Sequence, residues 1–364
     1  MGGWASAERR RALREQLVAW QRQHGRNDLP WQRPATPYRV WISEVMLQQT
    51  RVETVVPYFE RFMGHYPQVA DLARAELDDV LGLWAGLGYY ARARNLHAAA
   101  QRIQIEWGGE LPEELEALQA LPGIGPSTAG AIRSLGHGLP APILDGNVKR
   151  VLARIAGIEG WPGRSPVARE LWALSAALVP EEDCRRFNQG LMDLGALVCT
   201  PREPACLLCP LASICTARAT GTPEAYPTPR PARQRPRRPV RLLLIEHADT
   251  LLLERRPASG IWGGLWSLPE CPPEQDPLAR AQALGAHCVP TGELPQRHHA
   301  LTHFELVLQP MRLQWSAAAT AVGEPGRQQD WFRPGQEALP GLPAPIRRIL
   351  RDAGYPIEEG PRGP

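Results

Sequence analysis

The sequence predicts a multidomain protein, in which an all-α domain over residues 1–218 is joined by a linker to a smaller α+β domain. Three observations support this fold class. Apolar residues recur at helical spacing, without polar–apolar alternation, through the first 220 residues. Residues 219–239 are rich in proline and arginine, cannot bury a core and are typical of an extended linker. Strand-like runs begin only at residue 240.

The composition is that of an ordinary globular protein large enough for two or three domains. Of the 364 residues, 43% are hydrophobic and 22% charged, with a formal net charge of +3. No apolar run approaches a membrane-spanning length, and the charged N-terminus lacks the apolar core of a secretory signal. Four of the seven cysteines crowd into residues 199–215, which indicates ligand chemistry in a reducing compartment. We therefore expect a cytoplasmic protein.

Helices with short turns account for the first domain. The apolar spacing predicts a polar turn over residues 26–34 and a helix from residue 36, with further helices over residues 5–24, 52–63, 69–72, 77–84 and 91–107.

The helix that begins at Thr36 carries the first candidate for chemistry. Thr36 is a suitable N-cap residue, and Pro37 at the first helical position loses no hydrogen bond. Glu44 shares a face with the apolar residues Val40 and Leu47. A carboxyl group on an apolar face has a raised pKa and can act as a general acid near neutrality. The alternative is a surface glutamate on an imperfect helix.

Residues 86–95 interleave two tyrosines with arginines just after a glycine-rich break. Aromatic rings can stack on or wedge between bases, while guanidinium groups hold phosphate oxygens. An ordinary turn with aromatic packing explains the same residues, so this segment is a candidate DNA contact and no more.

A second glycine-rich turn, Leu121-Pro-Gly-Ile-Gly-Pro-Ser-Thr128, lies between two predicted helices. Gly123 and Gly125 allow a sharp turn, and the following helix presents unpaired N–H groups that can bind a phosphate. Any helix–helix turn can use glycine. In an all-α domain, however, this pattern favours a helix-hairpin-helix clamp on the DNA backbone.

Asp145 is the second candidate catalytic carboxyl. It stands at the predicted N-cap of a helix marked by Val148 and Val151, where backbone N–H groups and the helix dipole should lower its pKa. Helix capping alone would explain it. Taken with Glu44, it provides one protonated and one charged carboxyl group, as in enzymes that cleave glycosidic bonds.

The pattern Cys199-x6-Cys206-x2-Cys209-x5-Cys215 predicts a bound metal centre. Zinc sites usually contain two Cys-x2-Cys pairs, and this segment has one. The irregular spacing favours an iron–sulfur cluster, with zinc as the alternative.

The C-terminal domain is predicted to contain strands and two short helices. Residues 241–246 and 251–255 form a predicted hairpin. They are followed by the segment Trp262-Gly-Gly-Leu-Trp-Ser-Leu-Pro269, a helix over 278–284, a strand over 302–311 and a terminal helix over 344–353.

Together these motifs resemble the MutY-type adenine DNA glycosylases of the helix-hairpin-helix glycosylase superfamily. The resemblance extends from about residue 8 to 218 and rests on segments 41–50, 86–95, 121–125 and 144–148 and on the four cysteines. The C-terminal domain resembles a Nudix domain, but the predicted helix at 279–284 lacks the glutamates that hold magnesium in Nudix hydrolases. We therefore expect no diphosphatase activity.

The resemblance implies an enzyme that excises adenine mispaired with 8-oxoguanine or guanine in double-stranded DNA, acting as a monomer in a bacterial-type, nucleoid-associated setting. It implies a six-helix subdomain over about 30–140 and an Fe–S subdomain from 1–29 plus 141–218. A lesion-recognition domain over 240–354 and a disordered tail over 355–364 would follow.

The resemblance also implies residue roles. Glu44 would protonate the adenine ring, Asp145 and Asn147 would stabilise the sugar cation, and the four cysteines would hold a [4Fe-4S] cluster. Ser127 replaces the catalytic lysine of the lyase relatives, which implies a monofunctional enzyme, although Lys149, the only lysine, could form an adduct. Leu301-Thr302-His303 replaces the Phe-Ser-His with which the family often recognises 8-oxoguanine. The implied DNA contacts are Gln49, Tyr89, Gly123, Gly125, Ser127, Lys149, Thr302 and His303.

Two alternatives remain from the sequence. A thymine-mismatch glycosylase of the same superfamily is disfavoured by the C-terminal domain and by the pair Tyr89 and Tyr90. A non-catalytic Fe–S DNA-binding protein would require both Glu44 and Asp145 to be merely structural.

Overall fold

The structure is a computed structural model that describes residues 6–231, 235–257, 260–301, 303–318, 328–335 and 340–357. Its contacts divide the chain into two compact units. The first comprises Met1–Arg74 and Asn95–Ala232, and the second comprises Ala75–Arg94 and Arg233–Pro364. Each unit is considered by itself below. Among the described residues, no helix has both the length and the apolar content needed to span a bilayer.

The first unit is helical throughout its described part, as predicted. The longer helices are α1 (Ala7–His24), α2 (Pro37–Leu47), α3 (Val52–His65), α4 (Val69–Arg74), α6 (Ala91–Trp107, which begins just before the unit), α9 (Gly146–Ala156), α10 (Ser165–Leu178) and α11 (Cys184–Leu197). Short elements complete it: η1 (Pro30–Gln32), α7 (Leu115–Gln119), α8 (Pro126–Ala131), η2 (Ile132–His137), η3 (Cys206–Leu208), η4 (Ala212–Ile214), α12 (Thr216–Ala219) and η5 (Pro223–Ala225).

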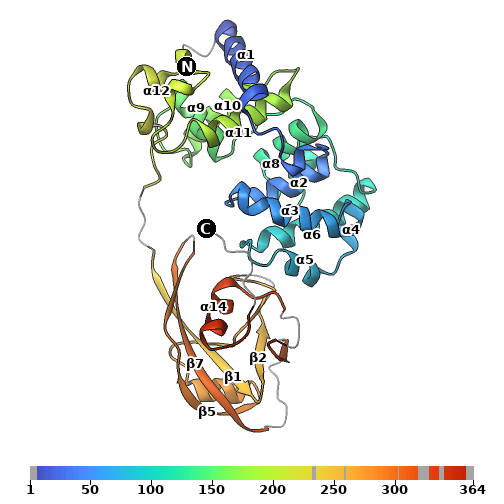
Figure 1. Ribbon diagram of the computed structural model, residues 1–364, viewed down its shortest axis with the longest axis vertical. Coiled ribbons are helices and arrows are strands. Elements are labelled where there is room, and N and C mark those ends of the chain that lie inside the picture. Colours follow the sequence, from blue (N-terminus) through green and yellow to red (C-terminus); the bar gives the residue numbers. More distant parts are fainter. Residues whose placement is uncertain are drawn as a thin grey trace. The chain divides into compact units, whose positions relative to one another are not determined.

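One continuous core holds α1, α9, α10 and α11 together. Leu17 of α1, Leu152 of α9, Leu171 of α10 and Phe187 of α11 belong to a single cluster, and all four are fully buried. Figure 1 shows these four helices grouped together. The N-terminal helix therefore packs against helices that begin at Gly146 or later in the chain, and this packing fixes the position of α11.

The second unit is built on a mixed sheet. Its elements are α5 (Leu77–Leu83), β1 (Arg237–His247), β2 (Thr250–Arg255), β3 (Trp266–Ser267), β4 (Glu270–Cys271), α13 (Pro277–Ala283), β5 (Ala286–Glu293), β6 (Arg297–Ala300), β7 (Glu305–Ala318), β8 (Gln329–Phe332) and α14 (Ala344–Asp352). The strand order is β3-β2-β1-β7-β5, with β4, β6 and β8 paired beside this path. The predicted hairpin is confirmed, because Glu246 pairs with Leu251 across an antiparallel β1–β2 turn.

Both faces of this sheet are covered. Alternate residues of β1 point to opposite sides, so that Leu242 and Leu244 pack with α14 while Leu243 and Ile245 pack with α13. The strand predicted over 302–311 begins later, at Glu305, and continues to Ala318. Figure 1 shows α14 against the long strands β1 and β7.

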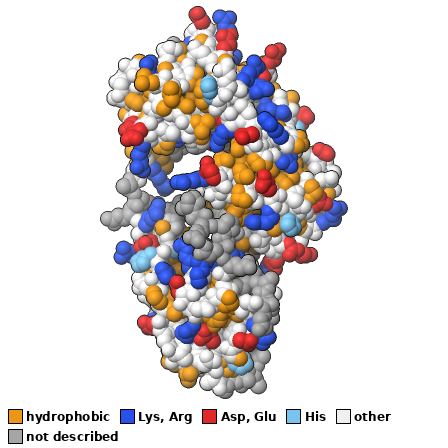
Figure 2. Space-filling view, in the orientation of Figure 1, with side chains coloured by type: hydrophobic (Ala, Val, Ile, Leu, Met, Phe, Trp, Pro, Cys, Tyr) orange, Lys and Arg blue, Asp and Glu red, His pale blue; other side chains and the backbone are white. Residues whose placement is uncertain are grey.

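Charged side chains on the visible face are mixed in sign. Figure 2 shows basic and acidic groups interspersed with apolar ones. This agrees with the small net charge of +3.

Candidate active site and cysteine loop

The helix α2 places Glu44 in the wall of a cavity. Thr36 caps the helix, since its hydroxyl accepts a hydrogen bond from the Arg39 N–H at 3.3 Å, and Pro37 occupies the first turn. Val40, Glu44 and Leu47 line the same cavity, as their predicted common face requires. The helix start and the apolar surroundings of Glu44 are therefore confirmed.

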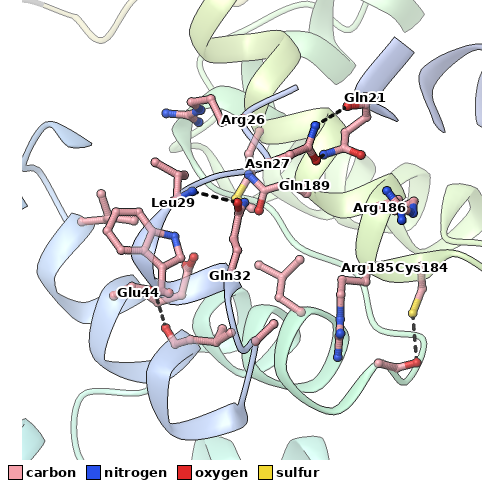
Figure 3. Close-up of a pocket in the computed structure, with 18 of the residues that line it drawn as sticks. Gln21, Arg26, Asn27, Leu29, Gln32, Glu44, Cys184, Arg185, Arg186 and Gln189 are labelled. Carbon is pink, nitrogen blue, oxygen red and sulfur yellow. Dashed lines mark hydrogen bonds between the residues drawn. The ribbon is translucent and has the colours of Figure 1, made fainter. Parts of the chain in front are cut away.

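The cavity has a volume of about 450 Å³, within the range of small-molecule binding sites. Its lining comes from the end of α1, the segment that follows α1, helix α2, the start of α3, the end of η2, and α11 with the residue before it. Figure 3 shows Glu44 from α2 and, across the cavity, Gln189 and Arg185 from α11. The lining residues outside α2 include Arg26, Asn27, Leu29, Trp31, Gln32, Leu135, Cys184, Arg186 and Met192.

Glu44 has the properties of a general acid near neutral pH. Burial raises the pKa of its carboxyl group to about 8, and the negative charge of Asp145 adds to the increase. The direction predicted from the sequence is correct. Because a carboxyl with this pKa is protonated at pH 7, Glu44 can donate a proton to a group inside the cavity.

Asp145 caps α9 as predicted, but the prediction of its pKa is wrong. Its Oδ1 accepts the Val148 N–H at 2.7 Å. Burial nevertheless raises the pKa of Asp145, because it outweighs the opposing effects of this hydrogen bond and of the nearby Arg150 and Lys149. The charge of Asp145 contributes to the raised pKa of Glu44, so in this pair Asp145 ionises first and Glu44 keeps its proton.

Asn147 is held beside Asp145 by α11. The Asn147 Nδ2 lies 3.5 Å from an Asp145 carboxylate oxygen, and Asn147 Oδ1 accepts a hydrogen bond from Arg150 Nη2 at 2.8 Å. Arg150 also donates to the carbonyl of Gly195, at 2.7 Å. A Cβ atom on Gly195 would lie 2.6 Å from the Asn147 Cβ, so glycine is required for this close approach of α9 and α11.

The glycine-rich hairpin is connected to the Asp145 segment. Gly123 has φ +78°, a conformation that favours glycine, and Gly125 is the N-cap of α8. The Ser127 hydroxyl accepts a hydrogen bond from the Leu144 N–H at 3.0 Å, one residue before Asp145. Lys149, on the first turns of α9, is partly exposed.

Two predicted DNA contacts have an unusual backbone conformation. Gln49 and Tyr89 both lie in the left-handed region, with φ of 60° and 52°, and both side chains are exposed. Such a conformation costs on the order of 1 kcal/mol in a residue with a side chain and is concentrated at functional sites. His303 is exposed in the second unit, whereas Thr302 lies outside the described residues.

The four predicted ligand cysteines line one small cavity at the end of the helical unit. Burial raises the pKa of the Cys209 thiol to about 12, and the other three cysteines add to the increase, so an isolated thiolate is disfavoured there. In the described part of the chain, no three His, Cys, Asp or Glu side chains are grouped so as to hold a single metal ion. Four thiols around one space are nevertheless the donor set of an iron–sulfur cluster, so these residues fit that group.

Arg154 holds the cysteine loop against α9. It is almost fully buried, and its guanidinium group donates to the carbonyls of Thr200, Pro201 and Tyr226 and to the Cys199 sulfur at 3.3 Å. The Arg154 side chain thus donates hydrogen bonds to backbone carbonyls both before and after the ligand cysteines Cys206 to Cys215.

The variant Arg154→Met should loosen this loop. It removes these hydrogen bonds and keeps an unbranched side chain, so we expect the thermal midpoint to fall by roughly 5–10 °C and proteolysis to begin between residues 199 and 226. Differential scanning fluorimetry and limited proteolysis measure both effects. The control is Arg218→Met in the same loop, because Arg218 is exposed and makes one bond to the Ala212 carbonyl. Equal stability of the two variants would contradict the assignment.

Sequence reasoning missed much of the cavity wall. Arg26 and Gln32 lie in the segment predicted only as a polar turn, and Gln189 lies on α11, which was not predicted as an individual helix. No spacing in the sequence indicates that these residues meet Glu44. Their proximity arises from the packing of α1 against α11.

Comparisons with known proteins place both parts of the chain in known families. Residues 42–177 match the family described as HhH-GPD superfamily base excision DNA repair protein, and residues 240–352 match the NUDIX domain. The chain is 35% identical over 336 residues to the adenine DNA glycosylase of Buchnera aphidicola subsp. Acyrthosiphon pisum, covering 92% of this chain and 96% of that protein. It is 37% identical over 363 residues to the adenine DNA glycosylase of Homo sapiens, covering 82% and 66%.

Solved structures agree with the helical fold. A thermostable thymine-DNA glycosylase matches with a TM-score of 0.54 and 29% identity, covering 59% of this chain and 99% of that one. A complex of endonuclease III with DNA has a TM-score of 0.50 at 23% identity, covering 59% and 96%, and shares the fold. The similarity to the adenine enzymes extends over most of the chain, which disfavours the thymine-mismatch alternative. The chain is therefore a DNA glycosylase of two domain types, helix-hairpin-helix and Nudix, and it belongs to the adenine DNA glycosylase family.

Proposed function

We propose that the protein excises adenine mispaired with 8-oxoguanine or guanine and leaves an abasic site, without an efficient lyase step. The observation that supports this proposal is the position and pKa of Glu44. Its carboxyl group lies in the wall of a 450 Å³ cavity and has a pKa of about 8, which the negative charge of Asp145 helps to raise. One protonated and one ionised carboxyl group are what the cleavage of a glycosidic bond requires.

In this mechanism the adenine leaves the base stack and enters the cavity. Extrusion costs a few kcal/mol, which wedging side chains offset. Glu44 donates its proton to the purine ring, so the base leaves as a neutral molecule. Asp145 stabilises the positive charge that develops on the sugar, and Asn147 assists by its contact with Asp145. Water then completes the hydrolysis.

Absence of a lyase step follows from the chemistry at Ser127. A hydroxyl group cannot form a Schiff base with the abasic sugar, and this one is engaged with the Leu144 N–H. Lys149 carries an amine near Asp145, and we propose a phosphate contact as its main role. An occasional adduct through Lys149 is the secondary possibility.

The proposed DNA contacts fall in both units. Gly123, Gly125 and Ser127 would hold the phosphate backbone, and Gln49 and Tyr89 would wedge the duplex, which is supported by their exposed, left-handed positions. Thr302 and His303, in the unit that contains the sheet, would read 8-oxoguanine on the other strand. Leu301 precedes them and supplies no aromatic ring.

We further propose that Cys199, Cys206, Cys209 and Cys215 hold a [4Fe-4S] cluster with a structural or redox-sensing role. The domain boundaries given above, monomeric action and association with the nucleoid stay predictions.

One assay tests the function. The protein is incubated in single-turnover excess with duplexes that contain 8-oxoguanine:A, G:A or G:T, and half of each sample is then treated with alkali. We expect strand breaks at adenine after alkali only. Breaks without alkali would contradict the monofunctional assignment. Release of thymine from G:T in place of adenine would contradict the substrate, and binding without base loss would contradict catalysis.

A further inference from the structure

The loop between α5 and α6 carries Tyr89 and has an unusual backbone. Gly86, Gly88 and Tyr89 have φ of 99°, 77° and 52°, so all three lie in the left-handed region. Glycine adopts this region freely, whereas a residue with a side chain does so at a cost. The Tyr89 side chain is also 52% exposed, so its ring contributes little to the core. Contacts elsewhere in the loop must therefore stabilise this backbone.

Two buried side chains hold the carbonyl group of Gly88. Trp84 Nε1 and Arg92 Nη2 both donate hydrogen bonds to its oxygen, each at 3.1 Å. A carbonyl oxygen has two lone pairs, so these two donors satisfy it fully. The Gly88 carbonyl belongs to the same planar peptide group as the Tyr89 nitrogen. Fixing the carbonyl therefore fixes the plane from which the φ angle of Tyr89 is measured.

Arg92 also bonds to the residues on either side of Gly88. Its Nη2 donates to the Leu87 carbonyl at 3.3 Å, and its backbone N–H donates to the Tyr89 carbonyl at 2.8 Å. A single residue on the first turn of α6 thus donates to three successive carbonyl groups of the loop. The loop and the start of the helix are therefore held as one structure.

The Arg92 guanidinium group lies close to two aromatic rings. Its central carbon is 5.5 Å from the centroid of the Trp84 ring and 5.5 Å from that of the Tyr89 ring, within the range of cation–π attraction. Burial lowers the pKa of Arg92 to about 10, and the proximity of Tyr89 opposes this change, so the group is charged at neutral pH. A buried charge is retained only where its partners satisfy it, and here the partners belong to the loop.

We propose that Arg92, together with Trp84, is a positioning residue that holds the ring of Tyr89 in place for insertion into the base stack. This inference rests on the proposed function and names the residues that prepare its wedge. Extruding a base is costly, and a wedge offsets this cost through its contacts with the opened stack. A ring that is ordered in the free protein loses less conformational entropy when it inserts, so more of the contact energy remains available for extrusion.

The test measures single-turnover release of adenine from an 8-oxoguanine:A duplex at saturating protein, for the wild type and for Arg92→Met. Methionine keeps an unbranched side chain but removes the charge and the donors. We expect the rate constant to fall by about 10- to 100-fold. Partial misfolding of the variant would lower the amplitude of the reaction and leave its rate constant unchanged. An unchanged rate constant would therefore overturn the proposal.

Base extrusion can also be measured directly. A 2-aminopurine placed next to the target adenine becomes more fluorescent when the neighbouring base leaves the stack. The Glu44→Gln background keeps the adenine attached during the measurement. Adding Arg92→Met to that background should give a smaller increase in fluorescence at saturating protein. An equal increase would show that Arg92 does not act on extrusion, against the proposal.

A double-mutant cycle with Tyr89→Ala isolates the route of the effect. Once the ring is absent, Arg92→Met should cause no further fall in the rate constant, and a second fall of the same size would contradict action through Tyr89. If Arg92→Met does not fold, Trp84→Phe carries the test. It removes the donor to the Gly88 carbonyl and keeps an aromatic ring, so the rate constant should fall. No change in that variant would overturn the proposal.

Arg61→Met is the matched control. It makes the same chemical change at another arginine–tyrosine contact, since the Arg61 guanidinium carbon lies 4.7 Å from the centroid of the Tyr58 ring on α3. Its rate constant and fluorescence increase should match those of the wild type. Equal losses in Arg61→Met and Arg92→Met would assign the effect to the lost positive charge and contradict the proposal. A wild type that releases no adenine contradicts the proposed function instead.

Discussion

Glu44→Gln is expected to lower adenine release by about 10³-fold while duplex binding stays within a few-fold of the wild type. Glutamine keeps the size and polarity of the side chain in the cavity wall but cannot transfer a proton to the base. Single-turnover release from an 8-oxoguanine:A duplex and electrophoretic mobility shift measure the two effects. Glu53→Gln, an exposed glutamate at the start of α3, is the control and should keep its activity. Full activity of Glu44→Gln would show that another group is the acid.

The rate of base release by the wild type should depend on pH through the protonation of Glu44. Only the protonated form of Glu44 is active, so base release should decline as the pH rises through about 8. Release should also decline at low pH, where Asp145, whose pKa burial raises, loses the negative charge that the mechanism requires. The contribution of Glu44 to stability also declines as the pH rises. The raised pKa favours the folded state at low pH, and this contribution is lost as the pH rises from the ordinary carboxyl value of 4.5 to about 8. Urea unfolding of Glu44→Gln should lack this loss, because glutamine does not titrate.

Asp145→Asn is expected to lower base release by about 10²- to 10³-fold with little change in stability. Asparagine caps a helix as well as aspartate does, so the bond to the Val148 N–H can persist while the negative charge disappears. The measurement pairs single-turnover rates with the thermal midpoint. The loss of activity should therefore reflect charge at the sugar cation and not the folding of α9.

A second N-cap provides the control for this variant. Asp276 caps α13 in the other unit, where its Oδ2 accepts the Ala279 N–H at 2.8 Å. Asp276→Asn makes the same chemical change at an N-cap in the other unit and should keep full activity. Comparable losses in both variants would mean that the Asp145 effect is one of stability.

Local patterns in the sequence were sufficient to predict that the first domain is helical and to identify the two candidate catalytic carboxyl groups. The cap at Thr36, the apolar face around Glu44 and the cap at Asp145 each depend on neighbours within a few residues, and all three are confirmed. The four cysteines are likewise local in sequence and line one cavity.

What the sequence could not provide depends on distant contacts. The pKa of Asp145 was predicted in the wrong direction, because its burial depends on packing that no local pattern encodes. Arg26, Gln32 and Gln189 could not be associated with Glu44, since the chain brings them together only when α1 packs against α11. The left-handed backbone conformation of Gln49 could not be predicted from the sequence either. Residues with a side chain disfavour this conformation unless the surrounding fold imposes it.

The dispersal of the cavity wall along the chain has a consequence for protein synthesis. Glu44 and Asp145 leave the ribosome well before Gln189 and Met192, which supply the opposite wall. A nascent chain that ends at α10 contains both carboxyls but no enclosed space for a base. The wall of the cavity is therefore complete only after α11 has been synthesised and has packed against α1.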